Sequence, residues 1–183
     1  MTGERVIGLY PRGVPAACRA YDPRAPAVAQ RVAGLIRRRL PRVPVEHVGS
    51  TAVPGCAGKG VVDLLALYRD ADELAAIKQV LDDLGFQRQR SPTPFPEDRP
   101  MRLGALDHGG TTFLLHVHVL PGDSSEVAEL RAFREQLRAD PALVAAYVAR
   151  KRGIIGAGVV DGGDYARAKG AFVRAILERH RQP

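Results

Sequence analysis

The chain has 183 residues, the usual size of one domain, and enough length to bury a core of normal size. Its 45% hydrophobic content is ordinary for a globular protein, and two cysteines are too few for a disulfide scaffold. No apolar run approaches the roughly 18 residues of a membrane span. We therefore expect one soluble, cytoplasmic domain over residues 1–183 with no membrane partner, and an extended arm over residues 1–20.

The formal net charge of +7 favours a polyanionic partner, either a nucleic acid or a phosphorylated small molecule. Arginine is scattered along most of the chain, and no RNA-binding aromatic motif, zinc finger or lysine tail accompanies it. We therefore expect a phosphorylated small molecule as partner, and we do not expect a nucleic acid.

The first 40 residues predict an arm and a helix. Residues 6–10 form a short apolar run, which predicts a weak strand or an extended arm. Tyr21-Asp22-Pro23 predicts a turn before a helix that has Pro26 near its first turn. The helix is expected over residues 27–40, because apolar residues recur there at helical spacing, namely Val28, Val32, Leu35, Ile36 and Leu40.

Residues 43–68 predict a strand, a glycine-rich loop over residues 49–60, and a second strand. Glycine lets the backbone approach a ligand closely, and hydroxyl and amino side chains add hydrogen-bond donors. We therefore expect the loop to bind an anionic group such as phosphate, through Gly49, Ser50, Thr51 and Lys59.

Asp63 interrupts the apolar second strand, VVDLLAL. A carboxylate is costly to bury unless it is paired or binds a metal ion. One interpretation is an aspartate satisfied by backbone N–H groups at a strand edge or a helix cap. The glycine-rich loop just before it favours the other interpretation, a functional carboxylate.

The middle of the chain predicts a helix followed by strands. The helix is expected to be capped by Asp72 and to run through Leu84, with Gly85 ending it. The strands expected after it are residues 86–90 and, beyond a proline-rich loop at 91–100, a hairpin of residues 101–106 and 111–120.

Two histidines lie on the second strand of this hairpin, TTFLLHVHVL. His116 and His118 are two residues apart, so in a strand they point to the same face as Thr112 and Leu114. Such a pair suits metal ligands, a general base, or partners of carboxylates. The spacing alone does not choose among these roles.

Helices are expected from residue 123 onward. Asp123 or Ser124 is expected to cap the first of them, which ends near Ala139, and Asp140-Pro141 to begin the second. Residues 153–163 are glycine-rich and are expected to be a loose connection, with Asp164 as the cap of the last helix. Three arginines share one face of the first of these helices, which by itself indicates a solvated basic surface: Arg131, Arg134 and Arg138.

Several of these segments together resemble the GrpB family. The run at residues 46–55, EHVGSTAVPG, with Lys59 and Val62-Asp63 after it, is similar to the signature of that family. The turn at residues 21–23 and the HVHV strand at residues 116–119 agree with it in order. The helical tail agrees as well, through Phe133, Arg134, Leu137, Arg138, Pro141, Tyr147, Lys151, Tyr165, Lys169 and Phe172. The resemblance covers nearly the whole chain from about residue 20.

This resemblance implies a fold of the nucleotidyltransferase superfamily, which is α/β (α+β): a small mixed β-sheet flanked by helices, with a helical C-terminal tail. It also implies an active-site loop at Gly49-Ser50. Active members of the superfamily carry two acids, two residues apart, on the next strand, and commonly a third on a later strand, and these bind two Mg²⁺ ions. Here Asp63 is kept, Leu65 stands in place of the second acid, and histidines stand on the later strand.

One carboxylate and two imidazoles suit Zn²⁺, Mn²⁺ or Fe²⁺ better than Mg²⁺. The site would then be a divalent-metal site formed by Asp63, His116 and His118. Alternatively no metal is bound and the histidines act as acid and base. Glu46 and His47 lie close in sequence and would complete either site.

Two functions follow from the resemblance. The first is a nucleotidyltransferase-like enzyme that acts on a nucleoside triphosphate or another phosphorylated small molecule. Its catalytic residues would be Asp63, His116, His118 and Ser50, and its further phosphate contacts would be Arg134, Arg138, Lys151 and Lys169. The alternative is a catalytically degenerate module that binds a nucleotide or metabolite. A third hypothesis, RNA binding, rests on charge alone.

Overall fold

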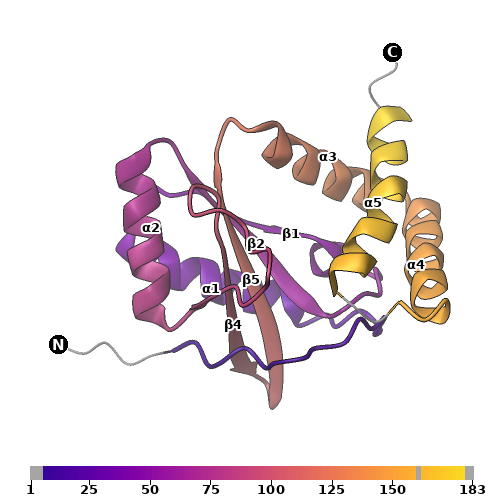
Figure 1. Ribbon diagram of the computed structural model, residues 1–183, viewed down its shortest axis with the longest axis horizontal. Helices are drawn as coiled ribbons and strands as arrows, with labels where there is room; N and C mark the ends of the chain where they lie inside the picture. Colours follow the sequence, from indigo (N-terminus) through magenta and orange to yellow (C-terminus); the bar gives the residue numbers. More distant parts are fainter. Residues whose placement is uncertain (1–5, 160–161, 180–183) are drawn as a thin grey trace.

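Five strands form one mixed sheet in the order β1-β2-β5-β4-β3 in a computed structural model that describes residues 6–159 and 162–179 (Figure 1). β2 and β5 run parallel, and the other neighbouring pairs are antiparallel. The strands are β1 (Val45–Val48), β2 (Val61–Tyr68), β3 (Gln87–Arg88), β4 (Met101–His108) and β5 (Thr111–Pro121).

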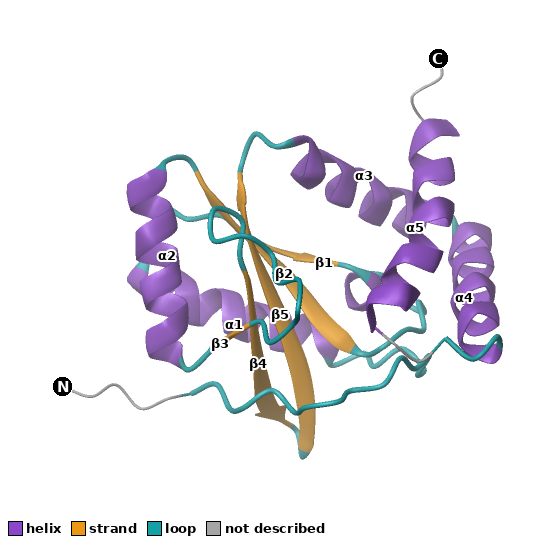
Figure 2. Cartoon of the chain, in the orientation of Figure 1, coloured by secondary structure: helices purple, strands orange, loops and turns teal. Residues whose placement is uncertain are grey.

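Helices flank this sheet (Figure 2). They are α1 (Ala25–Arg39), α2 (Ala71–Leu84), α3 (Ser125–Ala139), α4 (Pro141–Gly156) and α5 (Gly162–Arg179), with a short 3₁₀ turn, η1 (Ser50–Ala52), after β1. A small mixed sheet with flanking helices and a helical tail confirms the fold class that we predicted. No helix among the described residues is long and apolar enough to cross a membrane.

The two central strands alternate their side chains between the faces of the sheet. Leu64 and Ala66 of β2, with Leu115 and Val117 of β5, join the main core against α1 and α2. The intervening residues of β2 and β5 point to the opposite face, where α3 packs. This alternation confirms that His116 and His118 share one face, because their neighbours Leu115, Val117 and Val119 are buried on the other.

α3 covers only part of this second face. Val127 and Leu130 pack on Leu65, Leu67 and Leu120, together with Val48 of β1. Asp63, His116 and His118 lie on the same face and keep 22–27% of their side-chain area exposed. The second face therefore has an apolar part under α3 and a polar, accessible part.

Several helix ends differ from the sequence prediction. Asp70, and not Asp72, caps α2: its side chain accepts the Glu73 N–H at 2.8 Å, because extended backbone at Asp70 lets the carboxylate reach the first turn. Asp72 lies inside that turn. Ser124 is the cap of α3, as one of the two predicted alternatives.

The predicted loose connection at residues 153–163 is partly wrong. α4 continues to Gly156, because Ile154 is only 5% exposed and its burial holds the last turn against the core. α5 begins at Gly162, so Asp164 lies in its first turn and is not its cap. Residues 160–161 lie outside the described residues. The strand predicted at 86–90 is shorter, because only Gln87 and Arg88 pair with β4.

An extended arm precedes α1 and crosses the molecule beside the sheet (Figure 1). Ile7 donates its N–H to the Leu84 carbonyl at 3.0 Å, and Gly8 exchanges backbone hydrogen bonds with Ala105 of β4. The arm's other end is fixed where Arg19 exchanges hydrogen bonds with Gly58. The arm therefore joins the edge of β4 to the glycine-rich loop.

Candidate functional site

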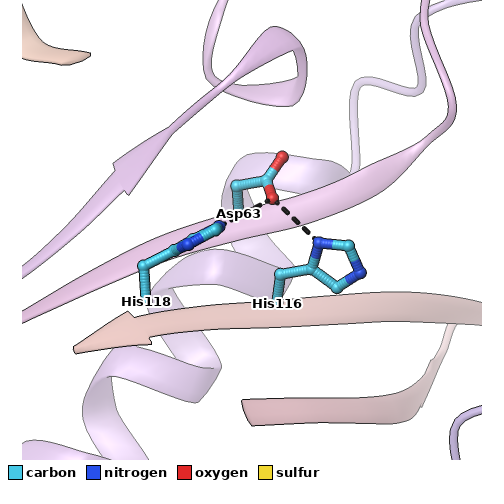
Figure 3. Close-up of side chains that lie close together, drawn as sticks. All are labelled: Asp63, His116 and His118. Atoms are coloured by element: carbon cyan, nitrogen blue, oxygen red, sulfur yellow. Dashed lines mark ion pairs between the residues drawn. The ribbon is translucent and has the colours of Figure 1, made fainter. Parts of the chain in front are cut away.

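Asp63, His116 and His118 meet on the polar part of the second face (Figure 3). Asp63 comes from β2 and the histidines come from β5, whose parallel register places His116 beside Asp63 and His118 beside Leu65. His116 Nδ1 lies 3.3 Å and His118 Nε2 3.5 Å from the same oxygen, Asp63 Oδ1. The fold thus brings together the three residues that the sequence predicted as a site.

Asp63 is held in its ionised form. Burial by itself would raise the pKa of Asp63, but hydrogen bonds from His116 and His118 and their charge outweigh it and hold that pKa well below its usual value. An ionised carboxylate only accepts hydrogen bonds. In the absence of an ion, both imidazoles therefore donate to Asp63, His116 from Nδ1 and His118 from Nε2.

The other oxygen of Asp63 faces Gly49. Gly49 has φ +73° and ψ −171°, a backbone conformation found almost only at glycine. A β-carbon at this position would lie 2.7 Å from Asp63 Oδ2, closer than any real contact. Only glycine therefore fits between the end of β1 and Asp63, and the loop begins against the carboxylate.

A buried lysine of α4 contacts the loop that follows Gly49. Lys151 of α4 is 1% exposed, and its Nζ lies 3.1 Å from Ser50 Oγ and donates to the Ala57 carbonyl. It also lies over the ring of Tyr147 at 4.3 Å. Burial lowers the pKa of Lys151. The structure thus places Lys151 beside Ser50, and the predicted phosphate role of both residues stays a prediction.

His47 is neutral and fixes the side of the loop toward α1. The Thr51 hydroxyl donates to the Val61 carbonyl at 3.1 Å, so it must accept from His47 Nε2 at 2.9 Å. Burial lowers the pKa of His47 to about 4, although the negative charge of Asp63 acts to raise that pKa. His47 therefore braces Thr51 and does not reach the three-residue site, contrary to the role we considered for it.

The arginines of α3 bind the backbone around the loop. Arg134 Nη1 donates to the His47 carbonyl at 2.8 Å, and Arg138 donates to the Ala52 carbonyl from Nε and Nη2 at 3.0 and 2.9 Å. Arg131 pairs with Glu46, and hydrogen bonds from Arg131 lower the pKa of that glutamate. The arginine face of α3 therefore binds the backbone around the loop, and the interpretation of this face as a purely solvated surface is wrong. The phosphate roles of Arg134 and Arg138 stay predictions.

The remaining predicted lysines lie near the start of α5. Lys59 Nζ lies 4.6 Å, and Lys169 Nζ 5.6 Å, from the centre of the Tyr165 ring. Tyr165 is 1% exposed. Both amino groups therefore contact one aromatic ring between the loop and α5. Their predicted contact with phosphate is not tested by this geometry.

Two aromatic residues beside the site escaped the sequence analysis. The Tyr10 hydroxyl lies 3.1 Å from His116 Nε2, and the Phe95 ring meets His118 edge-on, with ring centres 6.1 Å apart. Burial, followed by the charge of Asp63, raises the pKa of Tyr10, so its hydroxyl stays protonated at neutral pH. Tyr10 is 106 residues from His116 along the chain, and only the path of the arm reveals the contact.

The donor set fits a divalent ion. Asp63, His116 and His118 each offer one ligand atom, and these atoms all lie within 4.8 Å of one another. One carboxylate and two imidazoles suit Zn²⁺, Mn²⁺ or Fe²⁺ better than Mg²⁺, which prefers oxygen ligands. Leu65, at the position of the second acid, is fully buried under α3 and supplies no ligand. The ion would therefore be held by one carboxylate and two imidazoles, and not by two carboxylates on the same strand.

Comparisons with known proteins agree with this fold. A family model described as GrpB protein matches residues 15–179. A UPF0157 protein of Halalkalibacterium halodurans is 31% identical over 180 residues, which cover 96% of this chain and 88% of that protein. A UPF0157 protein of Streptomyces coelicolor is 34% identical over 137 residues, which cover 75% of this chain and 68% of that protein.

Two solved structures share the architecture. The conserved protein GrpB from Enterococcus faecalis superimposes with a TM-score of 0.70 at 23% identity, over 89% of this chain and 96% of that one. Cid1 poly(U) polymerase with bound MgGTP superimposes with a TM-score of 0.50 at 15% identity, over 70% of this chain but only 42% of the polymerase. At these identities the likeness shows the fold, which is that of nucleotidyltransferases.

Proposed function

The chain belongs to the GrpB family, and from that membership and the site geometry we propose that it is a metal-dependent transferase acting on a nucleotide or another phosphorylated small molecule. One observation carries the proposal: ligand atoms of Asp63, His116 and His118 gather within 4.8 Å on an accessible face. They lie beside a loop whose first residue, Gly49, must be glycine. Convergent titratable groups of this kind mark functional sites.

The surroundings of the loop support an anionic substrate. The amino group of Lys151 lies against Ser50, and the guanidinium groups of Arg134 and Arg138 lie against the backbone at the loop's start. Fixed positive groups behind a glycine-containing loop create a potential that favours phosphate. The net charge of +7 acts in the same direction. Cid1, which shares the fold, binds a nucleotide together with magnesium.

Each residue of the site would have its own role in the proposed reaction. Asp63, His116 and His118 would hold the ion, which when bound supplies an electrophile that polarises phosphoryl oxygens. The Ser50 hydroxyl would donate to a phosphate oxygen, since it lies at the start of the loop. The amino group of Lys151 would orient Ser50 through its contact with Ser50 Oγ.

A binding module of the same fold is the alternative, and Leu65 favours it. Active members of the superfamily place a second acid at this position, whereas here the side chain is part of the apolar cluster under α3. A site with a single carboxylate carries less negative charge to hold two ions. Binding without turnover is the behaviour that separates this alternative from the enzyme.

A thermal-unfolding matrix followed by a turnover assay tests both functions. The wild-type protein is heated alone, with Mn²⁺ or Zn²⁺, with each of the four common nucleoside triphosphates, and with both together. At 100 times the dissociation constant, a ligand stabilises by about 2.7 kcal/mol. We expect the ion and the nucleotide together to stabilise more than either alone. Release of phosphate or pyrophosphate is then measured in the same mixtures.

Two variants make the result specific. Asp63→Asn keeps the shape of the side chain and removes its charge, and it should abolish the joint stabilisation. His108→Asn removes another histidine of the same hairpin that lies outside the three-residue site, and it should behave as wild type. Joint stabilisation without turnover would support the binding module. Equal stabilisation of the Asp63→Asn variant would refute both functions at this site.

A further inference from the structure

The arm before α1 brings a side chain to the predicted metal site. Tyr10 donates its backbone N–H to Gln87 Oε1 at 2.7 Å, and two residues earlier Gly8 exchanges backbone hydrogen bonds with Ala105 at 2.8 and 3.1 Å. The arm is therefore anchored at Tyr10 and immediately before it. Tyr10 lies outside residues 15–179, where the family model matches.

The side chain of Tyr10 faces His116. Its hydroxyl lies 3.1 Å from His116 Nε2, and the two rings are tilted by 34° with centres 5.5 Å apart. His116 presents its other nitrogen, Nδ1, to Asp63 at 3.3 Å. Both nitrogens of the imidazole are thus engaged, and the ring cannot turn over without breaking one contact.

From this geometry we propose that Tyr10 is a positioning residue of the site: its hydroxyl orients the His116 imidazole so that Nδ1 addresses the ion. The proposal rests on the proposed function for the presence of the ion. Outer partners of ligating histidines commonly fix the ring and its tautomer in this way. The usual partners are carboxylates and carbonyls, which only accept a hydrogen bond.

A phenol suits this position because it serves both tautomers of His116. Without an ion, Nδ1 carries the proton that it donates to Asp63, so Nε2 accepts the Tyr10 O–H. If an ion were bound at Nδ1, the proton would lie on Nε2, which would donate to the Tyr10 oxygen. A hydroxyl can donate or accept, so one residue would stabilise the same ring orientation in both states. Phenylalanine keeps the ring packing and loses both hydrogen bonds.

The test compares Tyr10→Phe with wild type and with Tyr68→Phe. Tyr68 also donates one hydroxyl hydrogen bond, to the Asp98 carbonyl at 2.7 Å, so its variant controls for loss of a tyrosine hydroxyl elsewhere. Zinc and manganese alone are titrated into each protein by calorimetry. Loss of an outer partner typically weakens metal affinity by about 10–100-fold. We expect that loss for Tyr10→Phe and affinity within about twofold of wild type for Tyr68→Phe.

A second measurement needs no ion. The ¹⁵N resonance of His116 Nε2 in the metal-free protein reports whether that nitrogen accepts a hydrogen bond, and it should move in Tyr10→Phe and stay in Tyr68→Phe. Urea unfolding of both variants verifies that each is folded. Unchanged metal affinity together with an unchanged Nε2 resonance would overturn the proposal. If wild type binds neither ion, the metal part of the proposed function fails, and the resonance alone decides the role of Tyr10.

Discussion

Gly49 lies so close to Asp63 that no side chain fits at this position. A β-carbon on Gly49 would meet Asp63 Oδ2 at 2.7 Å, and its backbone conformation is almost exclusive to glycine. Gly55 in the same loop also has positive φ, at +76°, but a β-carbon there would meet nothing within 4 Å. The two glycines therefore separate the cost of backbone strain from the cost of displacing Asp63.

Gly49→Ala should lower the free energy of unfolding by at least about 1–3 kcal/mol, the usual cost of such a backbone conformation. It should also weaken binding of a divalent ion, because Asp63 must move. Gly55→Ala should lose stability through strain alone and keep its ion affinity. Urea unfolding and calorimetric ion titration measure the two effects. Equal ion affinity in both variants would show that Asp63 does not depend on Gly49.

His47 gives the protein a dependence of stability on pH. Its pKa is about 4 in the folded protein and about 6.5 in a free chain, so folding excludes a proton. The contribution of His47 is fully present above about pH 6.5 and is lost as the pH falls toward 4, because only the unfolded chain gains the proton. The expected loss between pH 7.5 and pH 5 is about 2 kcal/mol.

Urea unfolding at those two pH values measures this loss. His47→Gln removes the titrating group and keeps an amide donor near the Nε2 position that bonds to Thr51. We expect wild type to lose about 2 kcal/mol more than the variant between pH 7.5 and pH 5, by the proton-linkage relation. Parallel pH profiles of the two proteins would show that His47 is not buried in its neutral form.

At the residue scale, the sequence indicated which residues to consider for the site better than the contacts that they make. The residue patterns singled out Asp63 in an apolar strand and two histidines on one face of another strand. The resemblance to the GrpB family, and not these patterns, implied that the three residues meet, because each pattern fixes only a face. The sequence could not show that His47 bonds Thr51 or that Tyr10 reaches His116. Both contacts depend on where loops run in space, and loops carry no periodic signal.

At the element scale, α3 links the helical tail to the loop. Its arginines donate to carbonyl groups at the end of β1 and in η1. The periodicity of α3 predicted correctly that the arginines share a face. It could not show what that face meets, because packing of α3 against β1 is a long-range contact.

Arg134→Met should lower the free energy of unfolding by about 1–3 kcal/mol, because the Arg134 side chain is only 15% exposed and donates to the His47 carbonyl. Arg131→Met is the matched control: Arg131 is 42% exposed and pairs with Glu46, so its loss should be below about 1 kcal/mol. Urea unfolding without ligand measures both. Equal losses would indicate that the Arg134 contact does not brace the loop.

Helix boundaries were less predictable than helices. The caps differed because a favourable residue type stands at neighbouring positions, as with Asp70 and Asp72, and only the backbone conformation decides which carboxylate reaches the first turn. α4 continued through Gly153 because Ile154 gains burial. Tertiary packing overrode a local glycine signal there.

At the scale of the whole molecule, the two faces of the sheet differ in what they carry. α1 and α2 bury one face in the main core, while the other face carries both the packing of α3 and the polar site. The resemblance to GrpB proteins implied this mixed sheet, and the structure confirmed it. The arm adds a contact between Tyr10 and His116 from a distant part of the sequence.

Direct titration of a divalent ion tests the central claim, that Asp63, His116 and His118 form one metal site. Zn²⁺, Mn²⁺ and Mg²⁺ would be titrated calorimetrically into wild type, Asp63→Asn and His108→Asn. For wild type and His108→Asn we predict a single site with affinity in the order Zn²⁺, Mn²⁺, Mg²⁺, as imidazole ligands favour. For Asp63→Asn we predict a loss of more than about 100-fold, beyond the range of outer-shell changes. Equal affinity of Asp63→Asn and wild type would contradict the claim.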